Sequence, residues 1–381
     1  MKSFVSQLGL LAVSCLTIYA VLLAVTWIYV PPHRQEAGLD AGKAFRTLFA
    51  TEPKYVFLNR STLDNTKDKL LLLGASNMLV GFRQDQLQQL VPHAEVNNLS
   101  VGGSNISQLI QIVDLVHEVQ SVEARRHNTF VIGIWHGLFA DDSRRWTTVD
   151  RHAGDTDIDI ERYRYGFFRR TDSGPVAVLP PRLLQMGVYA IHPFLVIDKM
   201  VRDFVKSARA MLGVRSQPSL ITRGNVQISE AEKLRHLAFW QEYMGDNDVF
   251  DQQFGKFDLL VNKIVLAGGR VIVLDLPIPP WHAQRSRYQL EYQERTRQLF
   301  SSLSRLPYVA VLPWQSESED VAFVDEVHPN SKVAERWVHR MASALNNHVN
   351  ARQSASPSMV TDVSLQKNTD GLTTASTTVP R

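Results

Sequence analysis

A serine, a histidine and an aspartate occur in this sequence where they could form a nucleophilic site. Ser76 follows an apolar run in Gly74-Ala-Ser-Asn77, and Asp325 and His328 lie three apart in Val324-Asp-Glu-Val-His-Pro-Asn330. A serine hydroxyl needs a base to accept its proton, and imidazole titrates near neutral pH. A carboxylate on the other ring nitrogen fixes the tautomer and stabilises the imidazolium. These residue types predict acyl-transfer chemistry. A serine that only caps a helix in a turn and a solvated loop histidine would give the same sequence pattern.

The elements that must position these residues are predicted strands that alternate with helices. Short apolar runs predict strands at 69–73, 94–99, 129–134, 270–274 and 308–312. Such alternation is typical of βαβ units and a parallel sheet, in which ligands bind at the carboxyl ends of the strands. A turn after the first strand, permitted by a small residue at Gly74, would project Ser76 into that crevice. Free amides at the start of a following helix could then bind an oxyanion.

Helical periodicity marks three further elements. Apolar residues from Ile106 to Val119 share one face, with Ser104 or Asn105 available as the cap. A second pattern runs from Phe254 to Ile264, and a closing amphipathic helix is predicted over 331–345, capped by Asn330 or Ser331.

The order of these motifs resembles the SGNH/GDSL hydrolase superfamily. The resemblance lies in glycine-small-serine after the first strand, in Asn98-Leu-Ser-Val-Gly-Gly-Ser-Asn105 after the second, and in Asp-x-x-His-Pro before the last helix. It implies a flavodoxin-like three-layer α/β/α sandwich with a parallel sheet, and an enzyme that hydrolyses or transfers acyl esters, often on carbohydrates. It also implies Ser76 as nucleophile, His328 as base, Asp325 as orienting acid, and the amides of Ser76 and Gly103 as oxyanion donors.

The sequence departs from the family pattern at two places. Ala75 stands where the family usually has aspartate, and the third strand ends in Gly133-Ile-Trp-His-Gly137 without the asparagine that completes the oxyanion hole. We expect Asn77 or His136 to substitute as the donor, or the hole to have two donors only. Losing one donor typically costs a factor of about 10²–10³ in rate.

Aromatic residues near the same strand ends are candidates for substrate binding. Trp281 and His282 follow the fourth predicted strand in a Pro-rich segment, and Trp135 follows the third. A tryptophan there could stack on a sugar face, and His282 could touch the substrate. A rigid Pro-rich loop is the alternative interpretation of Trp281 and His282.

The N-terminus predicts a membrane anchor. No charged residue occurs between Lys2 and Arg34, and residues 5–30 are apolar enough to cross a hydrocarbon layer that needs roughly 20 residues. A cleaved signal peptide or a lipoprotein signal ending at Cys15 fits less well, because the apolar run is long and continues past the cysteine. Flanking charges do not decide the orientation.

The remaining organisation is coarser. We expect a juxtamembrane segment at 31–67, the α/β domain at 68–350 with an insertion at about 141–250 beside the active site, and a disordered Ser/Thr-rich tail at 351–381. The net charge of +3 gives no reason to expect nucleic acid, and the single cysteine allows no disulfide within the chain. Asp155, Asp157 and Asp159 alternate as in a calcium loop but lack its glycine and distal glutamate, so we expect no metal site.

Together these patterns predict an anchored serine esterase or O-acyltransferase that needs no cofactor. The expected substrate is an acylated envelope polysaccharide, another glycan or another ester. Membrane-anchored relatives of this kind imply a membrane-bound acyltransferase as a further partner, and a soluble domain on the periplasmic or extracytoplasmic side. The competing hypothesis is a catalytically degenerate protein that binds glycan or scaffolds a membrane polysaccharide-biosynthesis complex.

Overall fold

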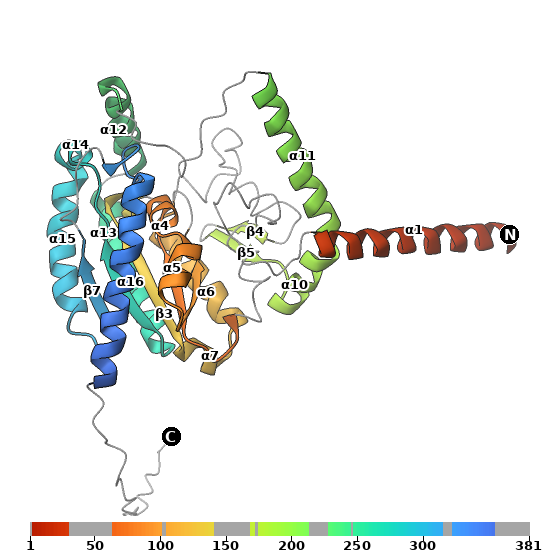
Figure 1. The fold of residues 1–381 in the computed structure, drawn as a ribbon, viewed down its shortest axis with the longest axis horizontal. Coiled ribbons are helices and arrows are strands. Elements are labelled where there is room, and N and C mark those ends of the chain that lie inside the picture. Colours follow the sequence, from red (N-terminus) through yellow and green to blue (C-terminus); the bar gives the residue numbers. More distant parts are fainter. Residues whose placement is uncertain are drawn as a thin grey trace, which may run out of the picture.

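A computed structural model gives the fold of this chain (Figure 1). It describes residues 2–29, 63–100, 104–140, 168–171, 174–212, 228–244, 247–314 and 322–354. The predicted juxtamembrane segment up to residue 62, the aspartates at 155, 157 and 159, and the tail from residue 355 onward lie outside the described residues.

The centre of the molecule is a five-stranded sheet in which all neighbouring strands are parallel. The strand order is β2-β1-β3-β6-β7. The strands are β1 (Lys69–Leu73), β2 (Glu95–Asn98), β3 (Asn128–Ile134), β6 (Arg270–Asp275) and β7 (Val309–Pro313). This confirms the predicted α/β class with a parallel sheet. It also confirms each of the five predicted strands to within one residue at either end.

Helices connect the strands and cover the sheet. In chain order they are α4 (Ser76–Gly81), α5 (Gln84–Leu90), α6 (Ile106–Val119), α7 (Val122–Arg126), the 3₁₀ helix η2 (His136–Phe139), α13 (Asn247–Leu266), α14 (Pro280–Arg285), α15 (Arg287–Leu303) and α16 (Ser331–Ser354). Of the two predicted caps of α6, the structure uses Asn105, whose side chain accepts from the Gln108 amide while the Gln108 side chain accepts from the Asn105 amide.

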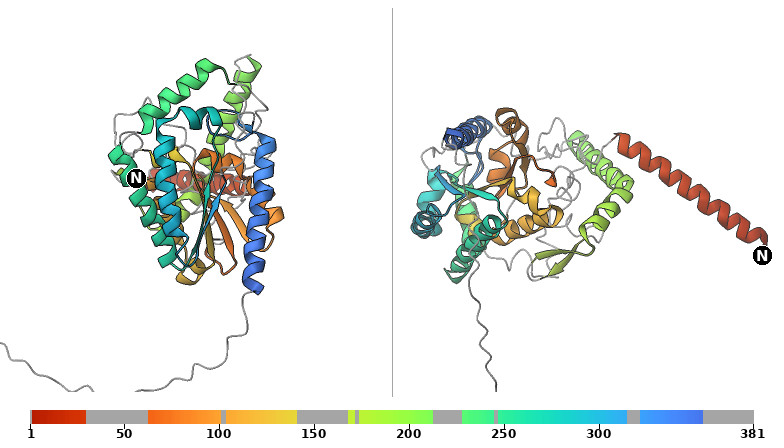
Figure 2. Two further views of the ribbon diagram at one scale, coloured as in Figure 1. Left: turned by 90° about the vertical axis from the view of Figure 1, so that its left-hand side faces the viewer. Right: turned by 90° about the horizontal axis from the view of Figure 1, so that it is seen from below.

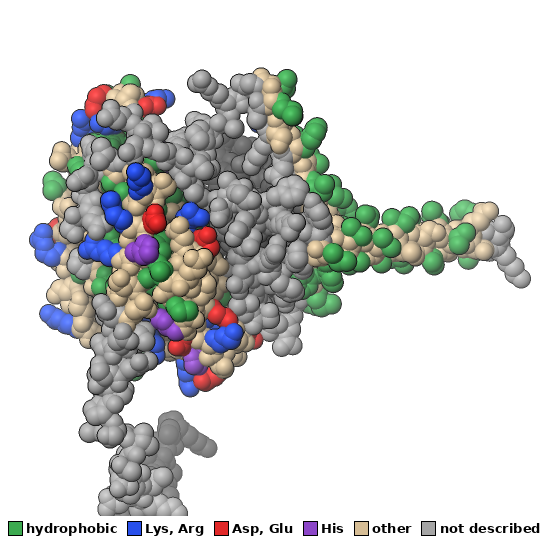
Figure 3. All heavy atoms as spheres, viewed as in Figure 1, with side chains coloured by type: hydrophobic (Ala, Val, Ile, Leu, Met, Phe, Trp, Pro, Cys, Tyr) green, Lys and Arg blue, Asp and Glu red, His purple; other side chains and the backbone are tan. Residues whose placement is uncertain are grey.

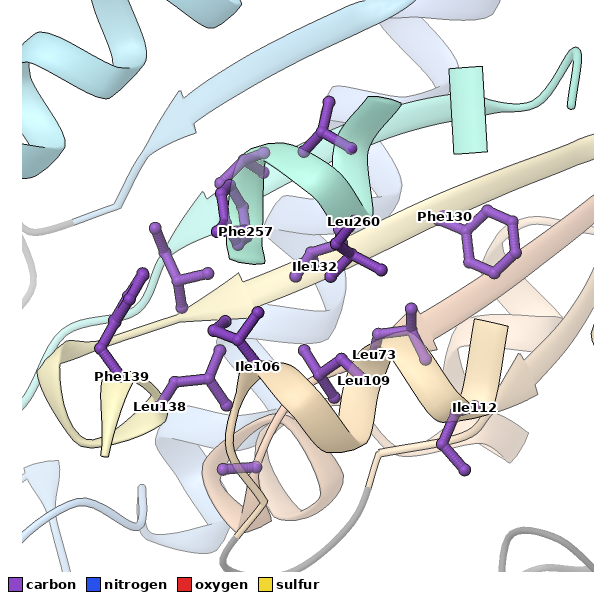
Figure 4. Packing of buried hydrophobic residues seen from close by; sticks show 14 of the residues in the cluster. Leu73, Ile106, Leu109, Ile112, Phe130, Ile132, Leu138, Phe139, Phe257 and Leu260 are labelled. Atoms are coloured by element: carbon purple, nitrogen blue, oxygen red, sulfur yellow. The ribbon is translucent and has the colours of Figure 1, made fainter. Parts of the chain in front are cut away.

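Both faces of the sheet are buried, and the alternation of side chains along β1 shows why. Leu71 and Leu73 pack into one apolar cluster with residues of α6, α13 and α15. Leu70 and Leu72 pack into a second cluster with residues of α4, α5 and α16. Successive side chains of a strand point to opposite faces, so a run of leucines requires cover on both. Figure 2 shows the sheet between α16 and the helices α13 and α15, and Figure 4 shows Leu109 of α6 and Leu260 of α13 among the buried residues of the first cluster.

The closing helix is longer than its sequence pattern predicts. The apolar face of α16 ends at Leu345, but the helix continues to Ser354, so the first four residues of the predicted disordered tail are helical. Residues beyond Leu345 include Ala, Arg and Gln, which favour helix without burying an apolar face. The prediction failed here because periodicity detects burial and not helicity itself.

The described part of the predicted insertion contributes elements in two places. Helix α12 (Glu230–Met244) packs against α14 and η2, next to the carboxyl edge of the sheet. The hairpin β4 (Phe168–Thr171) and β5 (Gly174–Ala177) contacts α6, and α10 (Pro181–Ala190) with α11 (His192–Met211) packs near the N-terminal helix. Helix α13 begins inside the predicted insertion and continues into the α/β domain.

The N-terminal helix α1 (Lys2–Tyr29) extends away from the α/β domain (Figure 1). Within the described residues it is the one helix long and apolar enough to cross a membrane, over Phe4–Ile28, with a mean hydropathy of 2.5. Its apolar side chains are exposed almost all round, which is typical of a helix surrounded by lipid.

Candidate active site

Ser76 lies at the turn where β1 passes into α4. The carbonyl oxygen of Ala75 accepts from the amides of Met78 and Leu79, so the helix begins directly at Ser76. The side chain of Ser76 is half-buried, whereas both of its neighbours are buried. The strand thus delivers the hydroxyl to the carboxyl edge of the sheet, and the first amides of α4 have no partner within the helix.

Glycine at position 74 is required by close packing at this turn. A Cβ at Gly74 would lie 2.6 Å from the Cβ of Met78 and 3.0 Å from the carbonyl oxygen of Gly133. Neither atom can move without shifting the backbone of α4 or β3.

We therefore expect Gly74→Ala to lower the free energy of unfolding by about 1–3 kcal/mol, the usual cost of overpacking. Urea denaturation checks this. The matched control is Gly255→Ala in α13, where an added Cβ meets nothing within 4 Å and a better helix former should stabilise by about 0.5–1 kcal/mol. Equal effects of the two changes would contradict the packing argument.

The structure brings Ser76, His328 and Asp325 together in a hydrogen-bonded chain. His328 Nε2 lies 2.6 Å from Ser76 Oγ. On the other side of the ring, Nδ1 lies 2.8 Å and 2.7 Å from the two carboxylate oxygens of Asp325. Asp325 and His328 are buried, and Ser76 is separated from His328 by 252 residues in the chain. This is the geometry that a nucleophile, its base and the orienting carboxylate require.

Asp325 also shapes the loop that carries His328. Its Oδ1 accepts from the amides of Val327 at 3.1 Å and His328 at 2.8 Å, and the Val324 amide donates to the His328 carbonyl at 2.9 Å. Burial by itself raises the pKa of Asp325. The hydrogen bond and charge of His328, together with the two backbone amides, outweigh burial and lower the pKa below its usual value. Asp325 is therefore ionised and oriented at neutral pH.

His282 holds the same loop from a neighbouring element. Its Nδ1 donates to the carbonyl oxygen of Glu326 at 2.8 Å, and its ring is fully buried. Trp281 is also buried, with its ring stacked on that of His282. The expectation that these two residues contact substrate is not supported, because α14 turns them inward. The structure instead shows His282 holding the loop that carries Asp325 and His328.

His136 and Trp135 lie in the core and not at an open site. Nδ1 of His136 lies 2.9 Å from Gln289 Oε1, and the ring packs 4.9 Å from those of Trp135 and His282. Both residues are buried. The expected role of His136 as an oxyanion donor is therefore not supported, and Trp135 is covered where a substrate-binding residue should be accessible. The pattern missed this because the packing partners Trp240 and Gln289 come from distant helices.

Burial of His136 predicts a pH-dependent stability. Burial, and secondarily the charge of His282, lower the pKa of His136 to about 3, although the bond to Gln289 opposes this. The folded chain thus keeps His136 neutral where an unfolded chain protonates it, below about pH 6.5. The stabilising contribution is present above that pH and is lost as the pH falls toward 3.

When the pH falls from 6.5 to 4.5, the free energy of unfolding of the parent chain should decrease by about 2–3 kcal/mol more than that of His136→Gln. Unfolding by urea at both pH values measures the difference. Ser343→Ala, exposed on α16, is the control and should behave like the parent. Parallel pH profiles for parent and His136→Gln would count against the neutral buried imidazole.

Two further residues were expected to supply oxyanion donors, namely Gly103 and Asn77. Gly103 lies outside the described residues. Ser104, next to it, donates its hydroxyl to the Gly74 carbonyl at 3.0 Å, which ties the loop after β2 to the turn at Ser76. Asn77 is fully buried, and its Oδ1 accepts from the Met78 amide. Its Nδ2 has no hydrogen-bond partner among the described residues, but it is buried as completely as His136, so the expected role of Asn77 as an oxyanion donor is not supported either.

Helix α12 adds a contact to the loop of Asp325 and His328 that the sequence did not reveal. His236 Nδ1 lies 3.1 Å from a carboxylate oxygen of Glu326, the residue that follows Asp325. The hydrogen bond to Glu326 raises the pKa of His236, and partial burial opposes it. The insertion is thus attached to the loop that carries His328.

Among the described residues, no group of three or more His, Cys, Asp or Glu side chains is placed to hold a metal ion. Comparison of the chain with protein-family models and with curated proteins gives no match.

Proposed function

We propose that this chain is a membrane-anchored SGNH-type esterase or O-acyltransferase. The observation that carries the proposal is the Ser76–His328–Asp325 chain, with Ser76 Oγ 2.6 Å from the ring nitrogen that would take its proton. The sheet order also supports it. Renumbered along the chain it reads 2-1-3-4-5, which is the order of flavodoxin-like doubly wound folds. We therefore include a flavodoxin-like three-layer α/β/α sandwich in the proposal.

The proposed reaction proceeds through an acyl-enzyme. Ser76 Oγ attacks the ester carbonyl carbon while His328 Nε2 accepts the hydroxyl proton, and Asp325 stabilises the imidazolium. The tetrahedral intermediate carries its negative charge on the former carbonyl oxygen, which the backbone amide of Ser76 would stabilise. Collapse expels the alcohol, which takes the proton from His328. Water or a sugar hydroxyl then attacks the acyl carbon while His328 accepts its proton, and His328 returns that proton to Ser76 Oγ as the bond between Oγ and the acyl carbon breaks.

The substrate class and the compartment come from the resemblance and from α1. An acylated envelope polysaccharide or other glycan is the proposed substrate, and α1 is the proposed single-pass anchor. The catalytic domain then faces the periplasmic or extracytoplasmic side, where such polymers are found. A membrane-bound acyltransferase that supplies acyl groups is a proposed partner.

A fluorophosphonate probe tests the nucleophile without knowledge of the natural substrate. The phosphorus is attacked by Ser76 Oγ and fluoride leaves, so the label stays on the protein. We expect the label on the peptide that contains Ser76, and none after His328→Gln, because the base is lost. Labelling of other serines only, or equal labelling of the two proteins, would exclude the proposed mechanism.

A degenerate glycan-binding protein or scaffold is the second candidate. The observation in its favour is the missing asparagine after β3, whose position is taken by the buried Trp135 and His136. A degenerate member would have no reason to keep a base hydrogen-bonded to Ser76, so we favour the enzyme. Absence of labelling at Ser76 in the folded protein would reverse that preference.

A further inference from the structure

Helix α11 exposes a stripe of large apolar side chains. Phe194, Ile197, Val201 and Phe204 follow one another at intervals of three or four residues, which places them on one face of the helix. Phe204 is 73% exposed. Neighbouring exposed residues widen the stripe, namely Met200, Val205 and Met211. Soluble surfaces rarely show a continuous apolar patch of this kind unless it binds something.

The stripe begins where α11 is attached to α1. The Tyr19 hydroxyl donates to the carbonyl of Ala190, and its ring lies 6.0 Å from that of Phe194. His192 Nδ1 lies 3.2 Å from the hydroxyl oxygen of Thr26, and the Trp27 ring is 6.5 Å from that of His192. These contacts fix the corner between α10 and α11 to the second half of α1.

The two apolar surfaces form one continuous region. Figure 1 shows α11 running across the end of α1, and Figure 3 shows hydrophobic side chains along α1 that continue onto α10 and α11. On α10, the exposed residues Leu183 and Met186 extend the region. The end of α1 nearest the α/β domain thus contacts α11, which lies across α1 and has one exposed apolar face.

The length of α1 places this junction at the membrane surface. The apolar span of 25 residues is about 38 Å long at 1.5 Å per residue, which exceeds a hydrocarbon core of roughly 30 Å. When the N-terminal end fills the core, the last turns reach the headgroups, and Trp27 lies there. The α10–α11 corner is bound to these same turns.

We propose that α10 and α11 lie flat in the lipid interface of the leaflet from which α1 emerges. The apolar stripe would sit at the boundary between headgroups and acyl chains, where amphipathic interfacial helices bury their apolar side. The sequence of α11 carries Lys199, Arg202, Lys206 and Arg209 against Asp198 and Asp203, an excess of basic residues that favours anionic lipids. This inference rests on the proposed crossing of a bilayer by α1, but not on the chemistry at Ser76.

Depth-dependent quenching in vesicles of phosphatidylcholine and phosphatidylglycerol tests it with the full chain. A bimane label on Cys15, the chain's single cysteine, reports on α1. In a Cys15→Ala background, labels at Phe204→Cys and Leu290→Cys compare α11 with an equally exposed apolar site on α15. We expect deep-chain doxyl lipid to quench Cys15, shallow doxyl lipid to quench position 204, and neither to quench position 290.

Quenching at Cys15 with position 204 no more quenched than position 290 would overturn the proposal while the anchor stands. Burial of position 204 in native membranes but not in pure lipid vesicles would also overturn it, in favour of a protein partner in the membrane. No quenching at Cys15 would remove the anchor and the interfacial helices together. None of these results would alter the outcome of fluorophosphonate labelling at Ser76.

Discussion

Replacing Ser76 by alanine should reduce turnover of an activated acyl ester by a factor on the order of 10⁴ to 10⁶, the loss typical of removing an attacking serine. The reason is specific to the geometry. The hydroxyl oxygen is the atom at 2.6 Å from His328 Nε2, and alanine leaves the base with nothing to deprotonate. Release of nitrophenol from nitrophenyl acetate by the full chain measures the effect.

The same variant should keep its stability, because a half-buried hydroxyl contributes only about 1 kcal/mol through one hydrogen bond. Ser343→Ala on the exposed side of α16 is the control and should retain full turnover. A transferase that uses water poorly would still show a first burst of nitrophenol close to one equivalent, since acylation does not need the natural acceptor. If Ser76→Ala kept both the burst and the turnover, the Ser76–His328–Asp325 chain would have no catalytic function.

The sheet could be predicted from the sequence because its signals are local. Leu70 to Leu73 is an uninterrupted apolar run, and such a run fits only a strand covered on both faces. Ser104 and Asn105 could be named as possible caps of α6 from their position before the apolar pattern, and the structure uses Asn105. The site residues could be predicted for a related reason, since Ser76 and the Asp325–His328 pair each follow a strand of a parallel sheet, and those ends meet at one edge.

What could not be predicted depends on contacts between distant elements. Trp281 and His282 have the same sequence signature whether they face a substrate or the core. Only the path of α14 decides that His282 reaches the Glu326 carbonyl. His136 likewise becomes a core residue through Gln289 of α15, a helix that the periodicity did not indicate. The contacts of α12 with Glu326 and of α11 with α1 are made by the insertion. Its sequence pattern does not indicate which elements it packs against.

Asp325→Asn should lower turnover by a factor of about 10⁴ while leaving the fold nearly intact. The asparagine Oδ1 can still accept hydrogen bonds from the amides of Val327 and His328, so the loop keeps its shape. Its NH₂ group, however, would face His328 Nδ1 and favour the tautomer with the proton on Nε2. That nitrogen would then donate to Ser76 instead of accepting its proton, and the base would be lost although every residue remained in place.

Comparison with Asp325→Ala separates the two roles of this carboxylate. Alanine removes the acceptor for both backbone amides, which lie in a buried loop, and should cost about 1–3 kcal/mol for each donor left unpaired. We therefore expect both variants to lose turnover but only the alanine variant to melt at a clearly lower temperature. Because the pKa of Asp325 is lowered, its contribution to stability in the parent chain is present above about pH 4 and is lost as the pH falls through the folded-state pKa. If Asp325→Asn kept most of its turnover, the carboxylate would serve the loop alone, and His328 would be oriented by its position in the turn and not by charge.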